Sequence, residues 1–214
     1  MRHPPLARGV EFGALFFVAV GGYALLGSPG SPIPVLLVFG GLALWWLRRQ
    51  PDFDRRDLWR REALRPALRP VLLTWAAAAV VGIGAVAVIR PDHLFDLPRE
   101  SPWIWLAVVI FYPLLSVYPQ ELLFRAFLLH RYAPVFGTGW AAAAASAVAF
   151  GFAHIILGSF WSVLLTLAGG WLFARRFQRT RSLLVASVEH SLYGVLAFTI
   201  GLGDLFYHGA SITR

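Results

Sequence analysis

The feature that most constrains this chain is a series of long apolar stretches that carry almost no charge. The sequence of 214 residues is 58% hydrophobic and only 14% charged. Soluble domains are typically about 45–50% apolar and about 25% charged. An uncharged apolar stretch of about 18 residues or more is long enough to cross the roughly 30 Å hydrocarbon core of a bilayer as a helix. The sequence therefore predicts an all-α, polytopic transmembrane helical bundle.

Seven membrane spans are predicted, the second and sixth of them short. Their approximate ranges are 10–27, 33–47, 71–90, 103–130, 138–156, 160–174 and 182–200. The first follows a basic N-terminus but no convincing cleavage site, so we read it as a retained span rather than a signal peptide. One long polar connection, 48–69, mixes arginines with acidic and apolar residues, and we expect an interfacial amphipathic helix there.

Basic residues indicate the orientation of the chain. Placing 48–69 in the cytoplasm also places the N-terminus, His130-Arg131 and the arginines of 175–181 there, as the positive-inside rule requires. The predicted location is therefore a cell membrane, with membrane lipids as partners. The net charge of +8 comes from these loop arginines and not from a basic stripe, so we expect no binding of nucleic acid.

Four ionisable side chains fall inside the predicted spans, where an unpaired charge costs several kcal/mol. Glu121 and Arg125 are four residues apart on one helix and can pair. His154 and His190 lie on two other spans. A lone buried histidine is often a packing residue, but two histidines and a glutamate on three spans favour a common polar cavity.

Depth supports a common cavity. A helix rises about 1.5 Å per residue, so counting inward from the predicted cytoplasmic ends places Glu121 roughly 16 Å deep, His154 roughly 20 Å and His190 roughly 12 Å. Because span ends are uncertain by a few residues, the three side chains are compatible with one layer near the bilayer midplane.

Such a cavity supports two kinds of chemistry. A glutamate and two histidines can activate water for attack on a carbonyl and stabilise the resulting oxyanion. The same residues could bind a divalent metal such as zinc, but the chain has neither cysteine nor a His-Glu-x-x-His motif. A metal would need ligands from three separate spans, so we predict water activation without a cofactor.

The same residues resemble a known family. Gln120-Glu121-x-x-x-Arg125 is similar to the Glu-Glu-x-x-x-Arg motif of the CAAX-protease and bacteriocin-processing family of intramembrane proteases, whose members include the type II CAAX prenyl endopeptidase. Phe150-x-x-x-His154 matches its second motif, and His190-x-x-x-Gly194 resembles its third, usually His-x-x-x-Asn. The motifs occur in the expected order over about 120–194.

The resemblance implies an intramembrane endopeptidase that acts on membrane-anchored or lipidated protein substrates. It implies catalytic roles for Glu121, Arg125, His154 and His190: Glu121 with His154 activating water, His190 facing the oxyanion, and Arg125 holding the fourth span through Glu121. Two positions depart from the motifs. Gln120 replaces the first glutamate, and Gly194 replaces an asparagine.

These departures leave alternatives open. In the first, Glu121 has taken over as the base. In the second, Glu189 serves as a second candidate carboxylate. In the third, the protein is a catalytically silent scaffold of the same fold. A proton-coupled carrier that uses Glu121, His154 and His190 as a relay is a further alternative, although no paired repeat is evident. We predict N-terminal helices with a basic loop over 1–100 and a protease-like core over 101–214, formed by the last four spans.

Overall fold

The computed structural model describes residues 5–28 and 30–206, and every regular element in these ranges is helical. This confirms the predicted all-α bundle. A helical run covers each of the seven predicted spans: α1 (Pro5–Gly13) with η1 (Ala14–Val18) and α2 (Ala19–Leu25); α3 (Pro32–Arg48); α4 (Leu64–Ile89); α6 (Pro102–Tyr112) with η5 (Pro113–Val117), α7 (Tyr118–Glu121), η6 (Leu122–Phe127) and α8 (Leu128–Arg131); α10 (Trp140–Ala153); α11 (Phe160–Thr180); and α12 (Leu183–Ile200). The connecting elements are η2 (Arg55–Leu58), η3 (Arg61–Ala63), η4 (Pro91–His93), α5 (Asp96–Glu100), α9 (Ala133–Phe136), η7 (His154–Leu157) and η8 (Gly203–Leu205).

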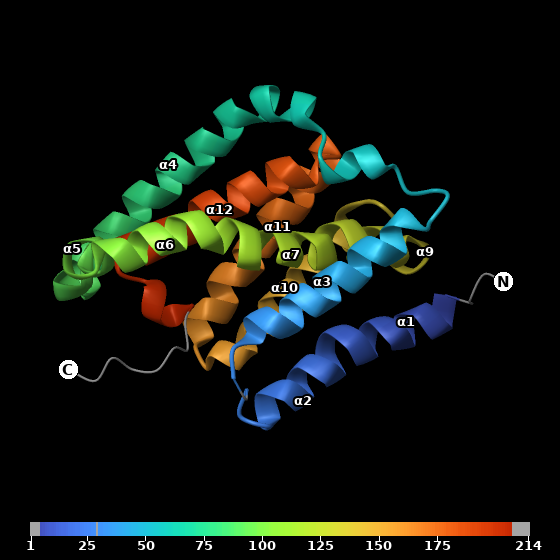
Figure 1. Cartoon of the computed structure of the whole chain (residues 1–214), viewed down its shortest axis with the longest axis horizontal. Helices are drawn as coiled ribbons and strands as arrows, with labels where there is room; N and C mark the ends of the chain where they lie inside the picture. Colours follow the sequence, from blue (N-terminus) through green and yellow to red (C-terminus); the bar gives the residue numbers. More distant parts are fainter. Residues whose placement is uncertain (1–4, 29, 207–214) are drawn as a thin grey trace.

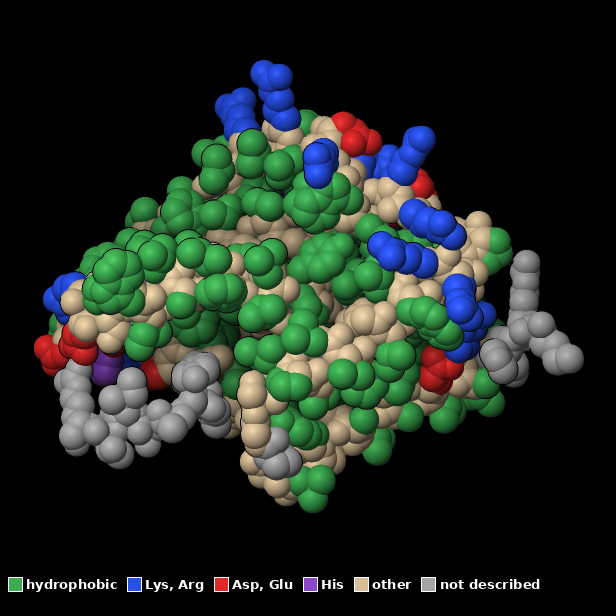
Figure 2. All heavy atoms as spheres, viewed as in Figure 1, with side chains coloured by type: hydrophobic (Ala, Val, Ile, Leu, Met, Phe, Trp, Pro, Cys, Tyr) green, Lys and Arg blue, Asp and Glu red, His purple; other side chains and the backbone are tan. Residues whose placement is uncertain are grey.

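Large apolar side chains cover the outside of the bundle. Val88 is 82% exposed and Trp103 is 81% exposed, and Figure 2 shows apolar side chains spread over most of the visible face. In water, apolar patches of this extent would drive association. Five described helical runs are long and apolar enough to cross a membrane, namely Pro5–Leu25, Arg61–Ile89, Pro102–Arg131, Trp140–Leu157 and Leu183–Ile200. The chain is therefore an integral membrane protein.

Helix α12 lies at the centre of the bundle. It packs against α4, α6 and α11, and α11 in turn packs along α10 (Figure 1). Small residues allow the close approach of α10 and α11: a Cβ added at Gly170 would lie only 3.0 Å from the Cα of Ala147. Close helix contacts through small residues are typical of membrane proteins. Helices α1–α3 lie on the opposite side of this core from α4 (Figure 1).

The fourth predicted span is an irregular helix. Two stretches of π-helix, η5 and η6, interrupt it. Pro113 begins η5, and Pro119 lies in α7 just before η6. Proline has no N–H to donate, so the regular i to i−4 hydrogen-bond pattern is broken at both positions. Single π turns of this kind often occur at functional sites, and here they flank Glu121.

The polar connection 48–69 differs from the prediction, because it is not an amphipathic helix. It contains only the short 3-10 helices η2 and η3 before α4 begins. Phe53 and Leu58 are buried in a core cluster with Leu47 and Leu183. The apolar residues of this segment therefore fill the end of the bundle and do not form one face of a surface helix.

A buried carboxylate helps to hold the same segment. Asp57 is fully buried and forms ion pairs with Arg60, at 2.9 Å, and with Arg181, which follows α11. Burial raises the pKa of the Asp57 carboxyl, and the two arginines partly oppose this rise. Figure 2 shows arginine side chains gathered around this end of the molecule. The assignment of that end to the cytoplasm stays a prediction.

Candidate active site

Glu121 and Arg125 lie next to one another on the irregular helix and are both fully buried. Arg125 Nε is 3.3 Å from Glu121 Oε2, so the pair predicted from the sequence spacing is present. The contact is ionic, and neither of these two atoms has a hydrogen-bond partner in the described part of the chain. Arg125 Nη2 also lacks one. The pair therefore keeps unused donor and acceptor capacity in a buried place.

Arg125 is fixed by the neighbouring helix. Its Nη1 donates a 2.8 Å hydrogen bond to Ser146 Oγ on α10, and Ser146 Oγ donates to the Phe124 carbonyl oxygen at 2.7 Å. The guanidinium also lies over the Phe150 ring, 4.6 Å from its centroid. These contacts satisfy part of a buried charge that would otherwise be costly. Arg125 thus joins the Glu121 helix to α10.

His190 on α12 contacts Glu121 directly. Its Nδ1 lies 2.9 Å from Glu121 Oε1, and both side chains are buried. A carboxylate accepts hydrogen bonds only, so Nδ1 carries the proton and the Nε2 lone pair is an acceptor. The Phe173 ring stacks on the imidazole at a centroid distance of 4.6 Å, with 14° between the planes. The ring is thereby fixed in position and tautomer.

A tyrosine completes the surroundings of His190. The Tyr112 hydroxyl, at the end of α6, lies 3.3 Å from His190 Nε2. The hydroxyl donates in this contact, because Nδ1 holds the ring proton. Tyr112 and Ser146 lie outside the three motifs, so the sequence offers no signal for either residue. The bundle brings them to the site from helices that the motif spacing does not relate.

His154 lies beside the cluster of Glu121, Arg125 and His190 but is not in direct contact with it among the described contacts. It begins η7 at the end of α10, and its Nδ1 donates a 2.8 Å hydrogen bond to the carbonyl oxygen of Phe150. Its Nε2 is therefore an acceptor. The ring centroid of Phe150 lies 4.7 Å from that of His154 and 5.4 Å from that of His190. Of the four predicted site residues, Glu121, Arg125 and His190 are in direct contact, and His154 is joined to them through Phe150.

Two nearby polar residues do not join this network. Glu189 is fully buried, and Arg176 on α11 binds both of its oxygens, at 2.8 and 2.9 Å. The second candidate carboxylate therefore makes an ion pair on another face of α12. Gln120 Nε2 donates to Ser116 Oγ at 2.7 Å, and Gln120 Oε1 is buried with no hydrogen-bond partner among the described residues.

The arrangement of these residues does not fit a metal site. Glu121 and His190 could supply two ligands, but His154 is joined to them only through the Phe150 ring among the described contacts. Within residues 5–28 and 30–206, no group of three or more histidine, cysteine or acidic side chains is placed to hold a metal ion. We therefore assign no step to a metal, and the predicted absence of a cofactor stays a prediction.

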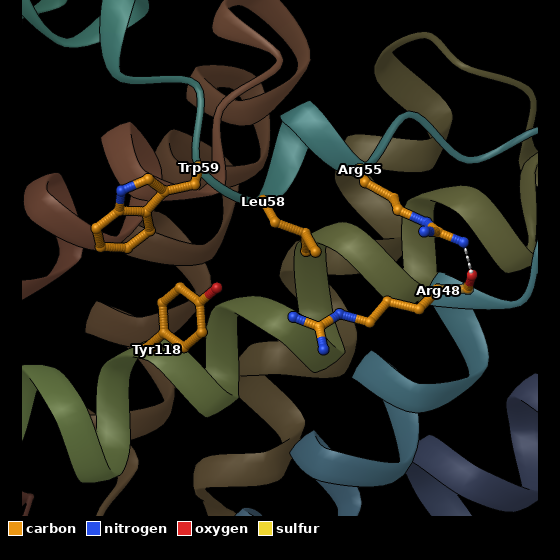
Figure 3. Close-up of a pocket in the computed structure, with 5 residues that line it drawn as sticks. All are labelled: Arg48, Arg55, Leu58, Trp59 and Tyr118. Carbon is orange, nitrogen blue, oxygen red and sulfur yellow. Dashed lines mark hydrogen bonds between the residues drawn. The ribbon is translucent and has the colours of Figure 1, made fainter.

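A cavity of about 510 Å³ lies where the polar connection meets the irregular helix. Figure 3 shows the residues that line it: Arg48, Arg55, Leu58, Trp59 and Tyr118. Arg55 Nη2 donates to the backbone carbonyl of Arg48 at 2.7 Å, while the Arg48 guanidinium extends toward Tyr118 (Figure 3). Tyr118 precedes Glu121 by about one helical turn, but none of the four predicted site residues lines the cavity.

Fold and site together define a helical membrane protein with a buried Glu–His–Arg cluster. Comparison with protein families then identifies residues 99–196 as a match to the family described as type II CAAX prenyl endopeptidase Rce1-like. The match covers a little under half of the chain, includes all four predicted site residues, and confirms the family resemblance. Comparisons with curated proteins and with solved structures gave no match.

Proposed function

We propose that this protein is an intramembrane endopeptidase that hydrolyses peptide bonds in membrane-anchored or lipidated protein substrates. The match of 99–196 to a family of CAAX prenyl endopeptidases supports this class of activity. The observation that carries the proposal is the 2.9 Å contact between Glu121 Oε1 and His190 Nδ1. Two buried ionisable groups from separate helices are held in one tautomeric arrangement, which is the arrangement that general acid–base catalysis needs.

In the proposed reaction, Glu121 and His190 act as one base. Glu121 accepts the Nδ1–H of His190 and so leaves the Nε2 lone pair as the proton acceptor. A water molecule at Nε2 loses a proton to it while the water oxygen attacks the substrate carbonyl. His154 Nε2, an acceptor because Nδ1 donates to Phe150, orients that water. His190 then returns the proton to the leaving amine as the C–N bond breaks.

Arg125 supports the reaction electrostatically. Its Nε and Nη2 atoms, which have no hydrogen-bond partner among the described residues, keep positive charge close to Glu121 and to the carbonyl oxygen that becomes negative. In this assignment His190 has more of the base role, and Glu121 less, than the family resemblance alone implies. The change follows from the observed partner of Glu121, which is His190 rather than His154.

The test is cleavage by purified protein in proteoliposomes. The substrates are a prenylated peptide that ends in a CAAX sequence and a single-span membrane protein. Glu121→Gln and His190→Ala should lower kcat by about 10²–10⁴-fold, and His154→Ala should also lower it. Asp204→Asn, in an exposed ion pair with Arg90, is the matched acidic control. Cleavage that survives all three site substitutions would exclude these residues as the catalytic group.

The same assay separates the proposal from its main alternative, a silent scaffold of the same fold. The observation behind that alternative is Gln120, an amide where the family motif has a carboxylate. If wild type is inactive on both substrates and Gln120→Glu creates activity, the natural protein is the scaffold. A chelator arm completes the assay, since activity lost on chelation and restored by zinc would overturn the metal-free mechanism.

A further inference from the structure

Gly194 lies one helical turn after His190 on α12. A residue of another helix fills the space that a side chain at position 194 would occupy. A Cβ added at position 194 would meet the ring and the hydroxyl of Tyr112, with Tyr112 Cζ only 2.6 Å away. Real Cβ atoms do not come so close to ring atoms, so any larger residue at 194 would displace Tyr112. The glycine and the tyrosine are therefore a matched pair.

Tyr112 is held in this position by more than the gap at Gly194. Its ring makes an edge contact with Phe198 at 5.5 Å and with the His190 imidazole at 6.2 Å. Tyr112 ends α6, which packs along α12, and Pro113 follows it. The hydroxyl reaches 3.3 Å from His190 Nε2. The phenol therefore presents an O–H donor where a side chain at 194 would otherwise be.

We propose that Tyr112 is a further catalytic residue, whose phenol supplies the hydrogen-bond donor that Gly194 cannot. The proposal rests on the proposed function, because it gives Tyr112 a role in that same hydrolysis. Before reaction, the phenol O–H donates to His190 Nε2 and holds the ring in place. When substrate and water bind, the same O–H turns to the oxygen of the scissile carbonyl and frees the single Nε2 lone pair for the attacking water.

Proton positions explain why the phenol stays on the carbonyl oxygen during the reaction. The attacking water gives one proton to His190 Nε2, its oxygen forms the C–O bond, and the carbonyl electron pair moves to the carbonyl oxygen. Once protonated, Nε2 can only donate, so the phenol can no longer donate to it. The phenol oxygen then accepts from Nε2–H, and its O–H donates to the oxyanion. Collapse breaks the C–N bond, and Nε2–H gives its proton to the amine.

The experiment compares Tyr112→Phe with Tyr193→Phe in the proteoliposome cleavage assay. Both variants lose one phenol oxygen near the site, but Tyr193 packs on Phe173 and has no contact with His190 among those described. Tyr112→Phe should lower kcat by about 10²–10³-fold, the loss typical of one oxyanion donor, with KM within about threefold of wild type. Tyr193→Phe should leave kcat within about twofold.

A rescue variant distinguishes a catalytic donor from a packing residue. Gly194→Asn alone should be inactive, since the added side chain collides with Tyr112. Tyr112→Ala combined with Gly194→Asn removes the ring and supplies an amide donor, and should be at least about tenfold more active than Tyr112→Ala. A kcat of Tyr112→Phe close to wild type, or a double variant no better than Tyr112→Ala, would overturn the proposal.

A spectroscopic readout keeps this proposal separate from the proposed function. The ¹⁵N signal of His190 Nε2 in the detergent-solubilised protein should shift in Tyr112→Phe and not in Tyr193→Phe. An unchanged signal in Tyr112→Phe overturns the Tyr112 contact whatever the activity. If Tyr112→Phe shows the shift but the wild-type protein cleaves neither substrate, the proposed hydrolysis is overturned, and the catalytic role of Tyr112 with it.

Discussion

Two buried carboxylates on neighbouring helices, Glu121 on α7 and Glu189 on α12, show how differently the same group can be used. Glu189 is bound at both oxygens by Arg176, at 2.8 and 2.9 Å. Glu121 contacts one histidine at 2.9 Å, and its second oxygen has only a 3.3 Å ionic contact with Arg125. A saturated pair stabilises a fold, whereas an incompletely satisfied one keeps capacity for a substrate. His190 follows Glu189 directly in sequence but belongs to the Glu121 cluster.

The largest expected effect is the difference in activity between the two glutamates. Glu121→Gln removes the negative charge that would stabilise His190 when it takes the proton from water, so kcat should fall by about 10²–10⁴-fold. Gln keeps the size of Glu but leaves the buried Arg125 charge without its carboxylate, so stability should fall as well, and kcat is compared at a temperature where both proteins are folded. The measurement is kcat together with a thermal scan. If Glu121→Gln and wild type had equal kcat values, Glu121 would have no catalytic role to distinguish it from Glu189.

The next effect concerns stability at the other carboxylate. Leaving one charge of a buried pair without its partner costs about 3–5 kcal/mol, so Glu189→Gln and Arg176→Met should each lower the free energy of unfolding by about that amount. Replacing both, as Glu189→Leu with Arg176→Met, should cost much less than the sum. Unfolding in mixed micelles measures all three variants. Additive losses would show that the two residues do not act as a pair.

A smaller effect is expected at Ser146, whose hydroxyl oxygen accepts a hydrogen bond from Arg125 Nη1. Ser146→Ala leaves Arg125 Nη1 without its 2.8 Å acceptor, and an unsatisfied buried donor costs about 1–3 kcal/mol. Stability and kcat should both fall, because Arg125 is less well fixed beside Glu121. Ser162→Ala, another buried serine whose hydroxyl has no hydrogen-bond partner among the described residues, is the control. A loss no larger than that of the control would contradict the role of Ser146.

The smallest effect is a pH dependence at Asp57, a third buried carboxylate with arginine partners but outside the membrane spans. Burial raises its pKa in the folded protein, so the folded state binds a proton there more readily than the unfolded state. Stability should therefore fall as pH rises from the ordinary carboxyl pKa, about 3.9, to the raised value, and then level off. Asp57→Asn should lack this fall, and Asp92→Asn, an exposed control, should keep it. A wild-type profile that rises over this range would mean that the arginines outweigh burial.

Sequence reasoning predicted the parts of this protein that depend on local composition. Apolar stretches of about 18 residues or more have few stable alternatives to a helix in lipid, because backbone groups must be satisfied within the segment. The all-α fold is therefore confirmed, and so is the pairing of Glu121 with Arg125, which a spacing of four residues on a helix favours. The amphipathic helix expected over 48–69 was wrong, since Phe53 and Leu58 pack into the bundle end. The division near residue 100 stays a prediction.

What the sequence determined by itself is a membrane bundle that carries ionisable side chains on three of its spans, and a family resemblance in three short motifs. Only the tertiary structure decided their partners. His190 turns to Glu121 while Glu189 turns to Arg176, because neighbours on a helix point about 100° apart and each meets a different helix. Tyr112 reaches His190 because Gly194 leaves room for its ring. Such contacts depend on the packing of separate helices, which no spacing along one chain specifies.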